Sequence, residues 1–365
     1  MSTLSRYIGG RVVSTFLIAF ASVLLLIALV DLIELLRRDG GEAGFWTRAM
    51  MAGLHAPSIS LKALPFVMLL AAMWSYIQLA RSSELVAAWA AGRSFWGMAR
   101  PGIAAAAMIG IVAVTIYGPL ATAALAVHDR MKAYHFEGRG TLFSVTSEGL
   151  WLREAGEGGR IVIRAARTNA RGTELRDATF FRFGEDDALE QRIDTPIALL
   201  NQEVWMLTGA RIRTVDPAGS APPEEQRKPF ISIPTRLTPE EIQNSFAPPD
   251  SISFWALPRV IEAMQAAGFS ARRHEAHWQS LLALPALLAA MTLIAAAFAV
   301  RPPRFVSFGV VALGCALTGF AFYFMSDVSM ALGASGAAPP ALGAWAPVVG
   351  ATFLGLALAF YFREI

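Results

Sequence analysis

Six long apolar segments, divided into two groups of three by a long polar region, form the main pattern of this chain of 365 residues. A helix of about 20 residues is long enough to cross a hydrocarbon core about 30 Å thick. Because lipid offers no hydrogen-bond partners to the backbone, each segment is predicted to cross the membrane as a helix. The predicted spans are residues 12–36, 64–80, 103–127, 281–300, 305–325 and 345–362.

The polar region between the third and fourth segments has the pattern of an inserted all-β domain. Short stretches of alternating apolar and polar residues recur there, separated by turn-rich sequences such as EAGEGG and FGEDD. Such spacing predicts several short strands in a sandwich or open barrel. The predicted strands are 149–153, 160–164, 178–183, 193–200, 203–207 and 210–215.

Large apolar residues at alternating positions of these strands are candidates to face the interior of the β domain. The simpler interpretation is that they fill a core, and the alternative is that they line an interior open enough to hold acyl chains. These candidates are Trp151, Ile161, Ile163, Phe181, Phe183, Ile197 and Trp205.

The chain therefore divides into a membrane domain and an inserted domain. Residues 1–134 hold the first three spans with a surface helix at 82–91, and 135–250 form the β domain. Residues 251–277 are a helical return linker, and 278–365 hold the last three spans. A short amphipathic helix is predicted at 259–267, with Gly268 as its terminator.

The distribution of arginine predicts the orientation of the spans, because positive residues favour the cytoplasmic side of short loops. With the N-terminus inside, the cytoplasmic loops hold a clear excess of arginine, and the opposite short loops are balanced or carry no Lys or Arg. Both termini are predicted in the cytoplasm and the β domain outside it. With a net charge of only +3 and 55% hydrophobic residues, the scattered basic residues indicate topology rather than nucleic-acid binding.

No catalytic residue, metal or other cofactor is predicted. None of the three lysines follows a glycine as a phosphate-binding P-loop requires, and no Gly-x-Ser-x-Gly motif occurs. His274 and His277 have a spacing that suits a metal, but no further Cys or His lies near them in sequence. The single cysteine, Cys315, lies within the fifth span and excludes an internal disulfide.

An intramembrane aspartyl protease is an alternative, with Asp31 and Asp327 as the pair. Both lie near the outer ends of predicted spans, where water solvates a carboxylate, and this position disfavours the alternative. Replacing either residue with asparagine would abolish activity if the protein were such a protease.

The segment RSSELVAAWAAGR between the second and third spans predicts a short helix at the cytoplasmic membrane surface. Ser82 suits a helix N-cap, Glu84 the first turn, and Gly92 the exit, with Arg93 at the negative end of the dipole. Glu84 would share one face with three apolar residues, as a connector or as a docking helix for a cytoplasmic partner. These three are Leu85, Ala88 and Trp89.

Positive residues at the outer ends of the first three spans are candidates to bind a phosphate-bearing head group. The simpler interpretation is that their long side chains reach from the helix ends to water. The candidates are Arg37, Arg38, Lys62, Arg130 and Lys132.

Six segments, spread nearly from end to end of the chain, carry a family resemblance. They are LSRYIGGRVVSTFL, ARSSELVAAWAAG, GLWLRE, LTPEEI, AAGFSARRHEAHWQSLLALPALLAAM and AAPPALGAWAP. In these segments the chain resembles the LptF/LptG permease family of the lipopolysaccharide export machine, and more closely its LptG branch.

The resemblance implies a periplasmic β-jellyroll and a set of partners. These are an LptF-type permease paralogue, an LptB-type ATPase dimer, an LptC-type single-span protein, the bridge protein LptA and lipopolysaccharide itself. It also implies that the surface helix docks on the ATPase, so that Arg81, Glu84, Leu85, Ala88 and Trp89 couple the two subunits. Asp31 and Glu34 stand in the first span where family members carry a basic residue, which leaves Arg37 and Arg38 as the expected head-group contacts there.

The expected function is that of a non-catalytic permease subunit in the bacterial inner membrane. It would extract lipopolysaccharide and pass it to the periplasmic bridge, driven by the separate ATPase. Work is needed because each buried methylene of an acyl chain is worth about 0.8 kcal/mol. The alternative is a membrane scaffold or sensor that binds a periplasmic ligand or protein through its β domain and transports nothing.

Overall fold

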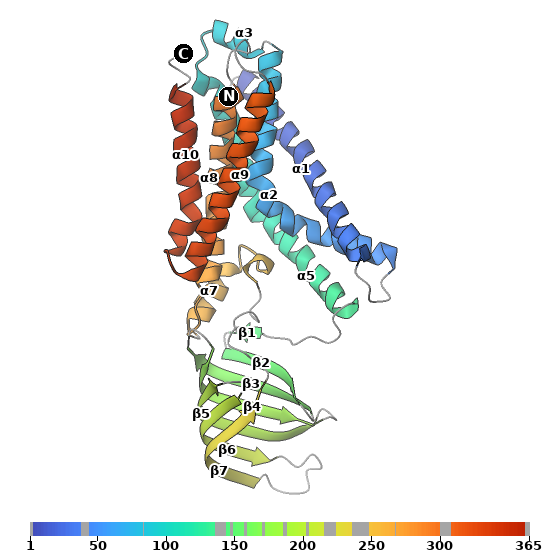
Figure 1. Cartoon of the computed structure of the whole chain (residues 1–365), viewed down its shortest axis with the longest axis vertical. Coiled ribbons are helices and arrows are strands. Elements are labelled where there is room, and N and C mark those ends of the chain that lie inside the picture. Colours follow the sequence, from blue (N-terminus) through green and yellow to red (C-terminus); the bar gives the residue numbers. More distant parts are fainter. Residues whose placement is uncertain are drawn as a thin grey trace. The chain divides into compact units, whose positions relative to one another are not determined.

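The computed structural model describes most of the chain as two compact units (Figure 1). Unit 1 holds residues 1–136, 250–255 and 272–365, and unit 2 holds 137–249 and 256–271. The described residues are 3–37, 44–82, 84–135, 144–146, 149–156, 159–169, 172–184, 188–201, 204–214, 224–235, 248–266, 268–299 and 308–361.

Unit 1 contains six candidate membrane spans among the described residues, which confirms the predicted helices. All six are longer than or shifted from the apolar runs from which they were predicted. Their helices are α1 (Thr3–Arg37), α2 (Phe45–Arg81), α4 (Phe95–Val112) with the π-helical η1 (Ala113–Tyr117) and α5 (Gly118–His135), α8 (Arg272–Ala299), α9 (Phe308–Ser335) and α10 (Pro340–Tyr361). The short α3 (Glu84–Ala90) lies between α2 and α4.

The core of unit 1 forms where α1, α2, α4 and α8 pack together. Val12, Met68, Met98 and Leu288 are completely buried members of it. A Cβ atom on Gly110 of α4 would lie 2.5 Å from the Cα atom of Pro285 on α8. Only glycine therefore permits this approach of two helix backbones, the kind of contact on which helix packing in membranes depends.

Helix α2 bends in its middle part (Figure 1), and Pro57 and Pro65 lie within it. Proline removes a backbone hydrogen bond and clashes with the preceding turn, which explains the bend. Ser60, between the two prolines, lies 2.7 Å from the hydroxyl of Tyr117 in η1. The irregular parts of the second and third spans therefore face each other.

Unit 2 is a seven-stranded antiparallel sheet in which the strands pair in the order of the sequence. The predicted inserted all-β domain is confirmed, and its strand order is a simple meander. The described residues of two predicted strands, 203–207 and 210–215, belong to the single strand β6, and β1 and β7 were not predicted. The strands are β1 (Ser144–Thr146), β2 (Gly149–Gly156), β3 (Gly159–Thr168), β4 (Glu174–Phe183), β5 (Leu189–Asn201), β6 (Val204–Thr214) and β7 (Glu224–Pro234).

The sheet curls so that its two edges approach each other. The hydroxyl of Thr235, directly after β7, donates a hydrogen bond of 2.6 Å to the buried carboxylate of Glu154 in β2. Inside the curl lies a core that includes Leu152, Phe180 and Trp205, each no more than 1% exposed. A sheet that closes in this way covers one whole face without a second sheet.

An irregular line crosses five strands of this sheet. The strand registers place Ala166, Asp177, Pro196, Gly209 and Pro229 opposite one another on β3 to β7. Asp177 and Gly209 have positive φ angles of 51° and 67°, and on β4, β5 and β6 the burial pattern shifts by one residue there. We call this line the seam. Such shared irregularities bend a sheet and increase its twist.

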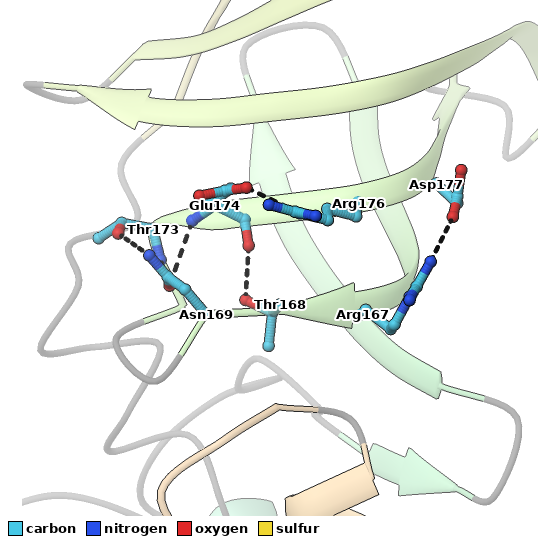
Figure 2. Close-up of polar contacts among 7 residues, drawn as sticks. All are labelled: Arg167, Thr168, Asn169, Thr173, Glu174, Arg176 and Asp177. Atoms are coloured by element: carbon cyan, nitrogen blue, oxygen red, sulfur yellow. Dashed lines mark hydrogen bonds and ion pairs between the residues drawn. The ribbon is translucent and has the colours of Figure 1, made fainter.

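Polar contacts hold the β3–β4 hairpin next to the seam (Figure 2). The Oδ1 atom of Asn169 accepts hydrogen bonds from the backbone N–H groups of Thr173 and Glu174, at 2.9 and 3.3 Å. On the other side of the hairpin, Arg167 lies 3.6 Å from the carboxylate of Asp177. The turn is thus fixed at its tip by an Asx-type cap.

A short amphipathic helix follows the sheet. Helix α7 (Leu257–Ala266) buries Leu257, Ile261 and Met264 along one face, and the 3-10 turn η2 (Pro249–Ser251) precedes it. Gly268 ends this helix with a φ of 91°, where a Cβ atom would collide with the carbonyl oxygen of Thr168. Both the amphipathic helix and its glycine terminator are confirmed.

Candidate functional site

Helix α3 is a short helix with the predicted glycine exit. Gly92 has a φ of 76°, and the backbone N–H of Arg93 reaches the carbonyl of Ala88 at 3.0 Å, which completes the termination. Ser82 does not cap α3 as predicted. It is the C-cap of α2 instead, and its hydroxyl donates a hydrogen bond of 2.9 Å to the Glu84 carboxylate.

Glu84 belongs to a polar network that joins three helices. The Tyr7 hydroxyl of α1 donates to Glu84 at 3.3 Å, and Arg11 of α1 reaches both Tyr7 at 3.3 Å and Gln78 of α2 at 2.9 Å. Figure 1 shows α3 at the end of unit 1 where α1 begins and α10 ends. These hydrogen bonds therefore connect α3 to the first two spans.

The predicted coupling residues do not all share one exposed face. Arg81 is exposed and Glu84 is half-buried, whereas Ala88 is only 8% exposed and packs in the core of unit 1. The side chains of Leu85 and Trp89 lie outside what the structure describes. Ala88 thus faces this chain itself, because a small residue there lets α3 lie close to the bundle.

The predicted head-group cations have different surroundings. Arg37 and Arg130 are exposed, Lys132 is half-buried, and Arg38 lies outside the described residues. Lys62 differs because it also lines a cavity. Of the predicted cations that the structure describes, Lys62 is the one that lines this cavity.

This cavity measures about 330 Å³ and lies within unit 1. Segments of α2, η1, α5, α8, α9, α10 and the 250–254 stretch line it. Most of its wall is apolar, with Phe66, Leu284, Met291 and Phe322 among the largest side chains. Its size and its mainly apolar wall with a few polar groups are typical of a ligand site.

The wall contains an ion pair that the sequence did not predict. The Nζ atom of Lys62 lies 2.6 Å from Oδ2 of Asp250, and Nδ1 of His277 lies 3.5 Å from Oδ1 of the same carboxylate. The side chain of Lys62 is 64% exposed, which places the pair at the opening of the cavity. His277 therefore faces a carboxylate, and the described residues contain no cluster of three metal-ligating side chains.

The pair keeps Asp250 ionised. Partial burial by itself raises the pKa of this carboxyl, but the hydrogen bond from Lys62 and the electrostatic effect of the nearby His277, Lys62 and Arg273 side chains outweigh it. The resulting pKa lies below the ordinary value of an aspartate, about 3.9. The negative charge of Asp250 is consequently present throughout the neutral range.

The stretch that carries Asp250 is fixed to the membrane helices. The indole N–H of Trp255 donates to the carbonyl of Thr115 in η1 at 3.2 Å, and Phe254 packs against the core of unit 1. A π-helical turn leaves carbonyl groups without their usual partners, so a donor from another segment is favourable there. Asp250 is thereby held next to Lys62.

Asp31 has a histidine partner. Its Oδ1 atom lies 3.0 Å from Nδ1 of His55 on α2, and the ring of His55 stacks on that of His128 at 4.7 Å. Asp327 lies instead on the cavity wall. An aspartyl protease requires two carboxylates that share a proton, and the described contacts of Asp31 and Asp327 do not pair them.

The six candidate acyl contacts of the β domain lie on two opposite faces of the sheet. Register places Ile163 opposite Phe180 and the buried core, and Ile161 shares that face. Trp205 lies on it too, with its ring 6.1 Å from that of Phe180. The other three candidates lie on the opposite face and are half-buried: Trp151, Phe181 and Phe183.

Arginines cover the aromatic rings on that opposite face. Arg160 lies 4.6 Å above the ring of Phe183, Arg164 lies 5.5 Å above Trp151, and Arg192 lies 5.7 Å above Phe181. Cation–π contacts of this kind are favourable and hold the guanidinium groups in place. These three aromatic residues therefore contact cations and do not line the interior of the curl. Ile197, the seventh inward candidate, is 37% exposed because it follows the seam.

Comparisons with known proteins agree over nearly the whole chain. A family model described as "Lipopolysaccharide export system permease LptF/LptG" matches residues 6–361. The chain is similar to the lipopolysaccharide export system permease protein LptG of Escherichia coli strain K12, with 24% identity over 99% of this chain and 98% of that protein. It is also similar to LptG of Haemophilus influenzae, with 24% identity over 90% of each chain.

Proposed function

Because this chain belongs to the LptF/LptG family of lipopolysaccharide export permeases, we propose that its cavity admits part of the exported lipid. The chain is a multi-pass, non-catalytic permease subunit of an ABC transporter. The observation that carries the proposal is the cavity itself. An apolar space among membrane helices suits acyl chains, and Lys62 at its opening suits a phosphate group.

The driving force would enter through α3. In this proposal an LptB-type ATPase dimer docks there, with Arg81, Glu84, Leu85 and Trp89 at the contact and Ala88 as a packing residue. The network from Glu84 through Tyr7 to Arg11 supports this, because it joins α3 to α1 and α2. An LptF-type paralogue would complete the membrane part, and an LptC-type protein would associate with α1.

The proposed location is the bacterial inner membrane, with both termini in the cytoplasm and the β domain in the periplasm. The excess of arginine in the loops on the α3 side supports this orientation. The β domain would pass the lipid to LptA. Within it, Ile161, Ile163 and Trp205 are the proposed acyl contacts. Because they face the inside of the curled sheet, the sheet would have to open for an acyl chain to reach them.

Photo-crosslinking tests the proposed cavity. A photoreactive residue in place of Phe322, on the cavity wall, is expected to capture lipopolysaccharide in the complete complex, and capture is expected to fall when ATP drives transport. Phe353, 68% exposed on α10 and not among the lining residues, is the matched control. Equal capture at the two positions would show contact with bulk lipid and would contradict the proposal.

A further inference from the structure

The Lys62–Asp250 pair determines the charge that the cavity offers to an incoming ligand. Lys62 is the sole Lys or Arg among the described residues that line the cavity, and Asp250 and Asp327 are its carboxylates. Asp250 uses one oxygen for Lys62 and the other for His277. As long as this arrangement holds, the cavity offers an incoming anion no uncompensated positive charge.

The pair is suited to exchange rather than to permanent closure. The side chains of Lys62 and Asp250 are 64% and 42% exposed, and exposed ion pairs contribute little to stability. A phosphate group carries up to about two negative charges and three acceptor oxygens, and therefore competes well with a carboxylate for one ammonium group. A neutral group has no such advantage.

Asp250 competes from a fixed position. Trp255 and Phe254 hold the 250–255 stretch against the membrane helices of unit 1. The Asp250 carboxylate therefore has a high effective concentration at Lys62, both with and without a bound ligand. We propose that Asp250 is a specificity-determining residue, a built-in competitor that occupies Lys62 until a phosphate group of a lipid head group displaces it. This rests on the proposed role of the cavity in lipid binding.

The consequence is selection against lipids without a phosphate group. Such a lipid gains the apolar contacts of the cavity but leaves the Lys62–Asp250 pair in place beside its head group. A phosphorylated lipid gains the same contacts together with Lys62 and His277. The permease would thus discriminate between the two lipids because only the phosphorylated one displaces Asp250 from Lys62.

Equilibrium binding to the purified permease–ATPase complex in nanodiscs tests this proposal. The probes are a bisphosphorylated glucosamine-disaccharide lipid and the same lipid after enzymatic removal of its phosphates. Asp250→Asn is expected to bind the phosphorylated lipid about tenfold more tightly and the dephosphorylated lipid unchanged. Lys62→Ala is expected to bind both lipids with similar affinity.

Asp327→Asn is the matched control, because it removes the same charge from the wall of the same cavity without touching the pair. It is expected to change either affinity less than twofold. Asp250→Glu, which keeps the charge, is expected to behave like the unmodified protein. Thermal unfolding of each complex shows whether a variant is folded, and the charge-retaining variant keeps the comparison possible if Asp250→Asn is unstable.

Three results would overturn the proposal. Asp250→Asn could bind the phosphorylated lipid no more tightly than the unmodified protein, or Asp327→Asn could tighten binding equally. Inorganic phosphate at millimolar concentration could displace the lipid from Asp250→Asn, which would make the site one for free phosphate. Failure of the unmodified complex to bind either lipid is distinguishable, because it would contradict the proposed function of the cavity itself.

Discussion

Single polar residues join segments of unit 1 at both of the places for which a function is proposed. Glu84 connects α3 to α1 through Tyr7, and Asp250 connects the return stretch to α2 through Lys62. Each carboxylate lies at an accessible position and has a specific donor, so its replacement changes a connection more than it changes the core. Residues of this kind are suited to test function separately from folding.

Glu84→Lys is expected to separate the permease from its ATPase. Reversal of the charge removes the acceptor for Tyr7 and places a positive charge at the proposed ATPase contact. Copurification of the ATPase should fall about tenfold or more, equivalent to roughly 1.4 kcal/mol. Tyr7→Phe, which removes the hydrogen bond but keeps the charge, should have a smaller effect. Undiminished ATPase binding and lipid release in Glu84→Lys would contradict the coupling role of α3.

Elements acquire their shape from a few irregular positions. The bend in α2 follows its prolines, and the curl of the sheet follows the seam from Ala166 to Pro229. Two prolines and two residues of positive φ lie along that line. Because the neighbouring strands share the irregularity, the sheet bends as a unit and can cover its own buried face.

Gly209→Val is expected to destabilise the β domain by about 1–3 kcal/mol, since a β-branched residue is strained at positive φ. The added Cβ atom would be in ordinary contact with Pro196 at 3.5 Å, so the cost comes from the backbone and not from a clash. Gly209→Asn should be milder because asparagine adopts this conformation more readily. Protease protection of the β domain in the full-length protein measures both, and equal protection of the two variants would show that the φ angle is unimportant.

At the scale of the whole molecule, we expect the six candidate spans to place the start of α1, the end of α10 and α3 on one side of the membrane. The β domain is inserted between the third and fourth spans and is therefore expected to begin and end on the other side. This arrangement separates the proposed site of ATPase docking from the domain that would pass the lipid onward.

Labelling with a membrane-impermeant maleimide tests this arrangement. Cysteine in place of Phe230, 72% exposed on β7, is expected to react in cells whose outer membrane is permeabilised. Cysteine in place of the exposed Ala90 in α3 should react only after the inner membrane is disrupted. The parent protein is the control, because its Cys315 is buried. The reverse pattern would place the β domain in the cytoplasm and contradict the proposed export.

The general architecture was predictable because it depends on local physics. Segments of 17 to 25 apolar residues must be helices in lipid, and alternation of apolar and polar residues indicates strands. The exit of α3 at Gly92 and that of α7 at Gly268 were likewise predictable, since both depend on one residue's access to positive φ. Family membership followed from the same sequence.

Contacts between distant residues required the folded chain. Alternation shows which residues of one strand share a face, but only register shows that Ile163 lies opposite Phe180 while Phe181 and Phe183 face the other way. The partnership of Lys62 with Asp250 likewise depends on how η2 packs against α2. Neither residue carries a local signal for the other, because an ion pair depends on distance in space and not on spacing along the chain.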